Sequence, residues 1–150
     1  MKPDYPALDF PPLEEDAVFV RQGLWYVRDP FRRKSVRLTP EEWVRQHLAR
    51  YLVAAGYPQG LIAVEKAIRV GGRTQRFDIV VFDRHNRPFM LVECKRPEQK
   101  LTPDTLNQAA RYNTVLGAPY LMISNGRKHY LCRVHPDGRT EFLKKLPRFA

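Results

Sequence analysis

The sequence predicts a single globular domain of the mixed α/β class, with helices that flank a sheet of parallel and antiparallel strands. Segments with helical and strand-like patterns follow the order helix, three strands, helix, strand, with short extra strands at both ends. Residues 89–92 (FMLV) form an unbroken apolar run, which is typical of a strand covered on both faces. A second buried strand-like run lies beyond the second helix, at 119–126. A helix between two such strands predicts a parallel crossover.

Residues 1–37 are expected to form an N-terminal extension packed on the core, and residues 38–150 the main domain. The extension begins with an irregular, proline-rich and acidic stretch, followed by short strands. The first helix is predicted to begin at the N-cap residue Thr39, with a proline at the first helical position. Glu42 at the third helical position is expected to complete a capping box. Gly56 is expected to end the helix.

The remaining elements are defined by apolar runs between turn residues. A Gly71-Gly72 pair separates the first two strands of the core, and His85-Asn86 lies between the second and third. The second helix is expected to begin at Thr102 and to end at Gly117. Strands are predicted at 61–70, 76–83, 88–95, 119–126, 128–134 and 140–146.

The two hairpin turns determine which acidic residues become neighbours. If the loop after the second strand has two or four residues, Asp78 lies directly opposite Glu93. A two-residue Gly71-Gly72 turn brings Glu65 opposite Asp78. A three-residue loop in the second hairpin would instead slip the register by one residue and turn Asp78 to the other face.

Glu93 and Lys95 share one face of the third strand because they are two residues apart. Carboxylates on three adjacent strands destabilise a sheet unless a positive charge lies between them. A divalent cation would provide that charge, since Mg²⁺ binds carboxylate oxygens. The alternative is a simple ion pair between Glu93 and Lys95 at the sheet edge, with Asp78 and Glu65 exposed.

The charge balance indicates a polyanionic partner. The formal net charge is +10 and the isoelectric point is near 9.9, which favours nucleic acid over an anionic membrane as the partner. A basic but merely solvated surface remains the alternative. The two cysteines show no zinc-binding spacing, and no apolar segment is long enough for a membrane helix, so the expected location is the cytoplasm.

Several segments together resemble a known family. The stretch FDIVVFDRHNRPFMLVECKRP resembles the D…ExK core of the PD-(D/E)xK nuclease superfamily. TPEEWVRQHLARYLVAAGYP, LIAVEKAIRVGGRTQRFDIVV, LVECKRP and LNQAARYN resemble the N-terminal nuclease domain of type I restriction enzyme R subunits, over residues 38–133. The resemblance implies a restriction-endonuclease-like fold and a metal-dependent DNA endonuclease.

By this resemblance, Asp78 and Glu93 would bind Mg²⁺, for which Mn²⁺ can substitute, with help from a backbone carbonyl at Cys94. Lys95 would orient or activate the attacking water. Many members place a further glutamate near the metal. Glu42 is the first candidate on the helix, and Glu41 and Glu65 are the substitutes.

The segment Gln108-Ala-Ala-Arg-Tyr112 matches a QxxxY motif that follows ExK in such domains. Gln108 and Tyr112 lie one helical turn apart on the same face, where they would orient the site or contact DNA. Arg76 and Arg96 are expected among the DNA-backbone contacts, and an ordinary amphipathic helix is the alternative for the motif. No base-reading module is recognisable, so any sequence specificity is expected to come from a partner.

The sequence departs from the family in two respects. Phe77 stands where the motif has proline, and the GxxxxGK[ST] phosphate-binding motif is absent, so no ATP site is expected in this chain. Other restriction-modification subunits are candidate partners, and the oligomeric state, including a dimer, is left open. A catalytically silent nucleic-acid-binding or assembly module is the alternative function, and a purely structural accessory domain is the third.

Overall fold

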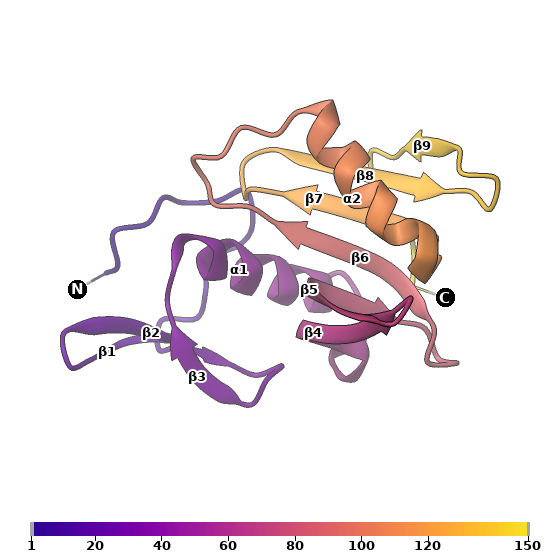
Figure 1. The fold of residues 1–150 in the computed structure, drawn as a ribbon. Helices are drawn as coiled ribbons and strands as arrows, with labels where there is room; N and C mark the ends of the chain where they lie inside the picture. The colour runs from indigo at the N-terminus through magenta and orange to yellow at the C-terminus, as the bar shows by residue number, and fades with distance from the viewer. Residues whose placement is uncertain (1, 150) are drawn as a thin grey trace.

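The structure is a computed structural model that describes residues 2–149, apart from the side chains of residues 70, 112, 114 and 115. Within that part of the chain, a three-stranded antiparallel sheet precedes a six-stranded mixed sheet and two α-helices (Figure 1). The elements are β1 Val18–Arg21, β2 Leu24–Asp29, β3 Lys34–Arg37, α1 Pro40–Ala54, a 3-10 turn Gln59–Leu61, β4 Ile62–Val70, β5 Arg73–Phe82, β6 Pro88–Cys94, α2 Pro103–Leu116, β7 Tyr120–Ser124, β8 His129–Val134 and β9 Thr140–Phe142.

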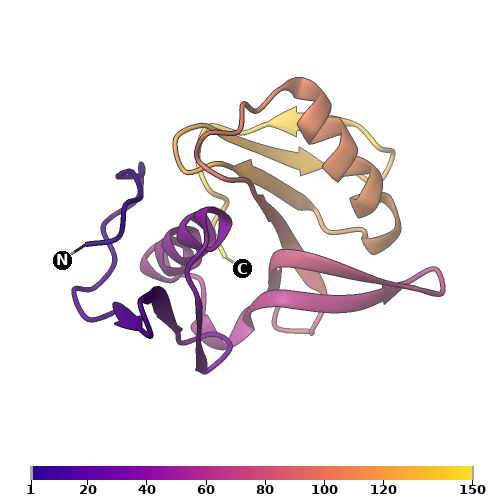
Figure 2. The ribbon, with the colours of Figure 1, turned by 60° about the vertical axis from the view of Figure 1, so that its left-hand side comes forward.

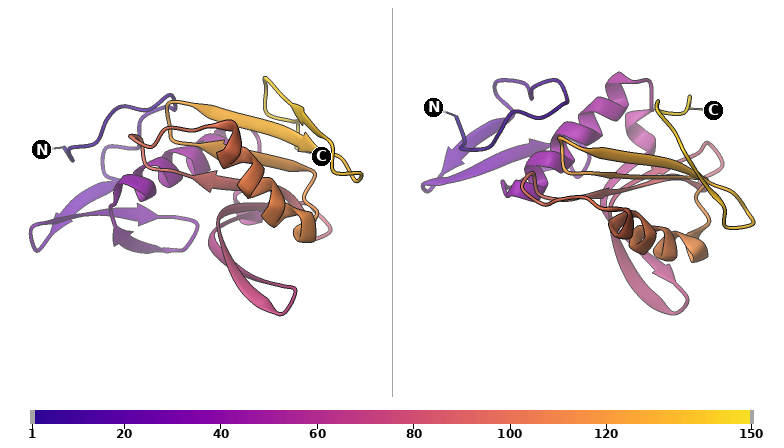
Figure 3. Two further views of the ribbon diagram at one scale, coloured as in Figure 1. Left: turned by 45° about the horizontal axis from the view of Figure 1, so that its top comes forward. Right: turned by 90° about the horizontal axis from the view of Figure 1, so that it is seen from above.

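The six-stranded sheet runs in the order β4-β5-β6-β7-β8-β9. The β6–β7 pair is parallel and the other neighbours are antiparallel, which confirms the mixed sheet and the parallel crossover through α2. Seen from above, α1 covers one face and α2 the other (Figure 3). The predicted fold class, helices flanking a mixed sheet, is therefore confirmed. No described helix is long and apolar enough to cross a bilayer.

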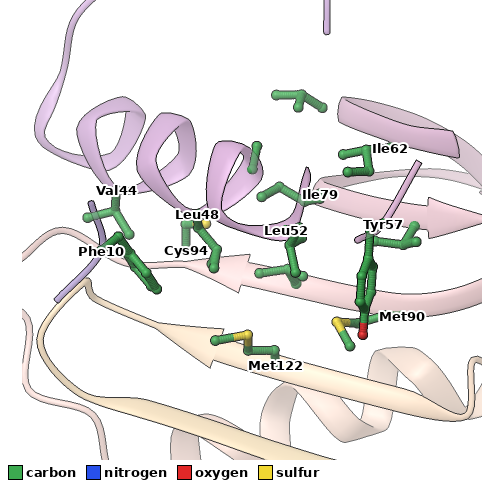
Figure 4. Close-up of a cluster of buried hydrophobic side chains, with 14 of the residues drawn as sticks. Phe10, Val44, Leu48, Leu52, Tyr57, Ile62, Ile79, Met90, Cys94 and Met122 are labelled. Atoms are coloured by element: carbon green, nitrogen blue, oxygen red, sulfur yellow. The ribbon is translucent and has the colours of Figure 1, made fainter. Parts of the chain in front are cut away.

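Two apolar clusters fill the space between the sheet and the helices. Val44, Leu48 and Leu52 of α1 pack on Met90 and other side chains of the near face (Figure 4). The opposite face packs beneath α2 in a separate cluster. Because successive strand residues point to opposite faces, β6 contributes to both clusters. This alternation directs Cys94 toward α1 and its neighbour Glu93 toward α2.

The start of α1 follows the predicted capping pattern in part. The Thr39 hydroxyl accepts a hydrogen bond of 3.0 Å from the backbone N–H of Glu42, as expected for an N-cap. The expected return bond from the Glu42 side chain does not form, because its carboxylate binds arginines and Gln46 instead. The complete capping box lies at α2, between Thr102 and Thr105.

The first core hairpin has the predicted two-residue turn. Val70 pairs with Arg73 across Gly71 and Gly72, whose φ angles of 57° and 82° suit glycine. The ladder follows the predicted register on both sides of Glu65. Glu65 itself has a φ of 55°, which removes it from the ladder, so the predicted direct pair with Asp78 does not form.

The second core hairpin differs from the predicted turn. Asp83 and Arg87 enclose a three-residue loop, in which the Asp83 amide donates to the Arg87 carbonyl at 2.7 Å. Such a loop alone would have turned Asp78 to the wrong face. Phe82 pairs with Pro88 whereas Val81 pairs with Met90, so a β-bulge shifts the register back by one residue. The predicted register, which brings Asp78 beside Glu93, is therefore retained. The β-bulge is the reason, and the turn residues did not predict it.

Candidate active site

Asp78 and Glu93 meet where β5 and β6 run side by side. Ile79 pairs with Val92, so the next position along each strand brings the two acidic residues together. Asp78 Oδ2 accepts a hydrogen bond of 2.8 Å from the backbone N–H of Cys94. This bond fixes the aspartate at the end of β6, directly beside the Glu93 carboxyl group.

The carboxyl group of Glu93 lies in an electrostatically unfavourable place. Burial and the neighbouring Asp78 carboxylate raise the pKa of Glu93 to about 8, although Lys95 and Arg45 act in the opposite direction. A carboxyl group with this pKa is largely protonated at neutral pH. A pair of carboxyl groups of this kind gains from the arrival of a cation.

A pocket of about 220 Å³ lies between this strand end and α2. Four of the predicted site residues line it: Glu93 and Lys95 from β6 and its end, Gln108 from α2, and Arg76 from β5. The Lys95 backbone N–H donates to the Ser124 carbonyl at 2.8 Å, which ties the strand end to β7. A carboxyl group, an ammonium, an amide and a guanidinium therefore face one volume.

Arg45 is the residue that sequence reasoning missed. It comes from α1, is buried, and one of its terminal nitrogens (Nη2) lies 2.7 Å from Asp78 Oδ1 and 2.7 Å from Glu65 Oε1. Its other terminal nitrogen binds Glu42 Oε1. This guanidinium thus supplies positive charge to Asp78 and Glu65, two of the three strand carboxylates, and to Glu42 of α1.

A second arginine completes the charge network on α1. Arg32, from the turn between β2 and β3, donates to Glu42 Oε2 at 2.6 Å, and Gln46 donates to the same oxygen at 2.9 Å. The N-terminal sheet is therefore joined to the site by an ion pair. The only available signal for Arg45 was its position three residues after Glu42, which brings both side chains to one face of a helix.

Burial alone would lower the pKa of the Arg45 guanidinium, but the carboxylates of Glu42 and Asp78 raise it above its usual value. The group therefore stays charged. Its Nε–H is buried and has no hydrogen-bond partner in the described part of the chain. An unpaired donor of this kind costs about 1–3 kcal/mol, which the surrounding ion pairs must offset.

The remaining predicted residues lie around this centre. Glu41 is exposed at the start of α1, and Arg96 is an exposed residue paired with Glu98 at 3.0 Å, outside the pocket. Arg76 also approaches Glu65 at 3.3 Å. The side chain of Tyr112 lies outside the described residues.

The pair of Asp78 and Glu93 fits a divalent cation of the Mg²⁺ type. The pair supplies two adjacent carboxyl groups whose joint ionisation is disfavoured without a cation, and Mg²⁺ in proteins takes one or two carboxylates with water and substrate phosphate as the other ligands. Among the described side chains, no group of three or more acidic, histidine or cysteine residues is arranged to hold a metal, so a third acidic ligand from Glu42, Glu65 or Glu41 stays a prediction. Arg45 pairs with Glu65 and with Asp78, and Arg32 pairs with Glu42.

A family model described as the N terminus of the type I restriction enzyme R protein matches residues 40–147. The chain belongs to this family. The resemblance inferred from the sequence is therefore confirmed, and the matched region holds α1, Asp78, the Glu93-Cys94-Lys95 segment and α2. The three-stranded sheet that supplies Arg32 precedes the region shared with the R-protein family.

The comparison with solved structures includes a crystal structure of a candidate nuclease of the DUF820 group from Anabaena variabilis. The two chains are 14% identical, with a TM-score of 0.49, over 89% of this chain and 80% of the other. This similarity is too low to support a conclusion about function. No curated protein matches the sequence of this R-protein N-terminal domain.

Proposed function

We propose that this domain is a Mg²⁺-dependent DNA endonuclease that hydrolyses phosphodiester bonds. The observation that carries the proposal is the convergence of Asp78, Glu93 and Lys95 at one strand end, beside a pocket lined by Gln108, in a member of the R-protein family. Asp78 and Glu93 would hold the cation. When bound, Mg²⁺ supplies neutralisation of phosphate charge and lowers the pKa of water.

The protein side chains then divide the remaining work. The Lys95 ammonium donates hydrogen bonds to the attacking water and to the phosphate oxygens, where negative charge grows during the reaction. Gln108, on the opposite wall of the pocket, orients the phosphate or the water through its amide. Arg76 lines the same pocket and is largely exposed, so it is placed to contact a neighbouring phosphate.

Arg45 gives Asp78 a fixed orientation in this scheme. With Oδ1 bound by Arg45 and Oδ2 by the Cys94 amide, the carboxylate has little rotational freedom. Such preorganisation lowers the cost of forming the reactive arrangement. The same ion pairs keep Glu42 and Glu65 in place, so we assign these two glutamates to the support of Arg45. A direct role of either glutamate in cation binding stays a prediction.

A catalytically silent DNA-binding or assembly module is the second candidate. The observation that favours it is the Arg45 network, which already neutralises Glu42, Glu65 and Asp78 without a metal. The two functions differ in one respect that can be measured, because only the nuclease requires cation binding by Asp78 and Glu93.

The deciding experiment follows the conversion of supercoiled plasmid to nicked circles with Mg²⁺, with Mn²⁺ and with a chelator. The intact domain and the Lys95→Ala variant are compared at equal concentration, and thermal unfolding confirms that both are folded. The expected result is cation-dependent nicking that the variant lacks. Equal nicking by both proteins would contradict the role of Lys95, and salt-sensitive DNA binding without nicking or cation binding would favour the silent module.

A further inference from the structure

The outward face of the β1–β3 sheet carries a cluster of arginine and aromatic side chains. Val27 of β2 is fully buried on the inward face, so its neighbour Tyr26 points outward. The register brings Phe19 and Arg37 to either side of Tyr26. Arg21 and Arg28 occupy the adjacent rows of the same face. We call these five residues the arginine face.

The two rings support the guanidinium groups. Phe19 and Tyr26 stack with their centroids 5.9 Å apart and their planes at 21°. The Arg21 guanidinium lies 5.4 Å from the Phe19 centroid and 5.1 Å from that of Tyr26, and the Arg28 guanidinium lies 4.6 Å from Phe19. Guanidiniums on aromatic rings are held in place by cation–π attraction and keep their edge N–H donors available.

The surrounding sequence makes this face strongly positive. Residues 17–38 contain six arginine or lysine residues and one acidic residue, so this segment alone contributes +5 to the net charge of +10. The acidic residue, Asp29, is buried and bound to Arg32 and two backbone amides. Within the described residues, neither Arg21 nor Arg37 has an ion-pair partner.

The arginine face extends toward the proposed active site. Arg37 is followed by Leu38, whose carbonyl accepts a hydrogen bond of 3.4 Å from the Tyr5 hydroxyl, and then by Thr39 at the start of α1. Arg96 lines a small hollow with Thr39 at the start of α1 and directly follows Lys95. Glu98 pairs with Arg96 at 3.0 Å, and Glu41 lines the same hollow.

We propose that the arginine face binds the phosphate backbone of the DNA substrate at a position flanking the cleaved bond. The proposal rests on the proposed function for the identity of the ligand. The rings are covered by guanidiniums, so they do not offer bare surfaces for base stacking, and the contact is to phosphates. Binding is therefore independent of base sequence and strongly dependent on salt. In Figure 2 the three-stranded sheet lies on one side of α1, and the β4–β5 hairpin, whose strand β5 carries Arg76, extends on the other.

The test measures binding of the purified domain to a fluorescein-labelled duplex in EDTA, by anisotropy, over a series of salt concentrations. The Arg21→Gln/Arg37→Gln variant removes two exposed charges from the arginine face. Each phosphate contact contributes about 0.9 to the slope of log K against log salt, so the slope is expected to become shallower by about 1.8. The dissociation constant at moderate salt is expected to rise at least about tenfold.

The matched control is Lys144→Gln/Lys145→Gln, which removes the same charge from two exposed residues of the C-terminal segment. This variant is expected to keep the slope of the parent domain. Equal weakening by the two double variants would mean a general charge effect and would overturn the proposal. An unchanged slope in the arginine variant, or no binding of the duplex by the parent, would overturn it as well.

Because no metal is present, this result is independent of cleavage. A parent domain that binds DNA through the arginine face but never nicks plasmid would contradict the endonuclease and leave the arginine face established. A parent that nicks plasmid while the arginine variant retains the full salt slope would contradict only the arginine face. Thermal unfolding of both double variants shows that the folded state is preserved, since all four side chains are exposed.

Discussion

The guanidinium of Arg45 lies 2.7 Å from Asp78 Oδ1, and this ion pair joins helix α1 to the strand that carries the proposed cation site. The same nitrogen contacts Glu65, and the other terminal nitrogen contacts Glu42. One cation therefore serves three carboxylates from three different elements. The cluster of acidic residues, which would otherwise oppose folding, becomes part of the packing between α1 and the sheet.

Arg45→Met is expected to destabilise the domain strongly. Methionine retains much of the buried volume but leaves Glu42, Glu65 and Asp78 without their common partner, and breaking a buried ion pair costs about 3–5 kcal/mol. Because Asp78 and Glu65 are partly exposed, we expect a loss of about 3 kcal/mol in the free energy of unfolding, measured with urea.

The control for this prediction is Arg139→Met, at an exposed residue of the β8–β9 turn, for which we expect a change below about 0.5 kcal/mol. In a double-mutant cycle, Arg45→Met and Asp78→Asn together should cost less than the sum of the two single changes by at least about 1 kcal/mol. Additive effects would show that the two side chains do not depend on each other.

Glu93→Gln is expected to separate folding from cation binding. The carboxyl group of Glu93 has a pKa of about 8 and is largely neutral at pH 7, so an uncharged amide of the same shape should leave the metal-free stability unchanged or slightly raised. The rise in melting temperature on addition of Mg²⁺ should be lost, since one of two proposed ligands is removed.

Differential scanning fluorimetry without Mg²⁺ gives the melting temperature of the metal-free domain. A second measurement with about 10 mM Mg²⁺, enough to occupy a weak site, gives the rise in melting temperature. Glu141→Gln, at an exposed glutamate of β9, is the control and should keep the response of the parent domain. An Mg²⁺ response in Glu93→Gln as large as that of the parent would remove Glu93 from the proposed site.

Gln108→Ala is expected to reduce plasmid nicking about 10- to 100-fold through the loss of a positioning contact in the pocket. Cation binding and the free energy of unfolding should stay unchanged, because the Gln108 side chain is exposed and is not part of either buried cluster. The adjacent Asn107→Ala is a close control, since Asn107 lines a different pocket. Equal losses in both variants would indicate a general effect of α2.

His47 is expected to make the domain less stable in mild acid. Burial lowers the pKa of His47 below its usual value of 6.5, although the ring donates a hydrogen bond of 2.7 Å from Nδ1 to the Trp43 carbonyl, which acts in the opposite direction. Below pH 6.5 the unfolded chain therefore binds a proton that the folded chain resists. The free energy of unfolding falls as the pH decreases, by at most about 1.4 kcal/mol per pH unit for one group.

Urea unfolding at several pH values from about 7.5 to about 5.5, which bracket the usual pKa of histidine, tests this dependence. His47→Gln should flatten the profile below pH 6.5, whereas His85→Gln, at an exposed loop position, should not. A parent domain whose stability is constant over this range would contradict the buried neutral state of His47.

Local sequence signals determined most of the element positions. Thr39 and Pro40 begin α1 because a hydroxyl acceptor and a fixed φ suit a helix start, and Gly71-Gly72 makes a two-residue turn because both positions require positive φ. The second hairpin shows the limit of such signals. Its three-residue loop shifts the strand register by one residue, and its β-bulge shifts the register back. The bulge depends on pairing with the neighbouring strand, so the loop residues alone do not predict it.

Residue types and their spacing were enough to predict the D…ExK residues, the family and the common face of Glu93 and Lys95, because side chains two positions apart on a strand share a face. The groups that balance the carboxylates could not be predicted in this way. Arg45 lies 33 positions before Asp78, and Arg32 reaches Glu42 from another sheet, so their contacts arise from packing between elements. The free energy of burying a charge depends on which groups surround it in space. The order of residues along the chain does not predict these neighbours.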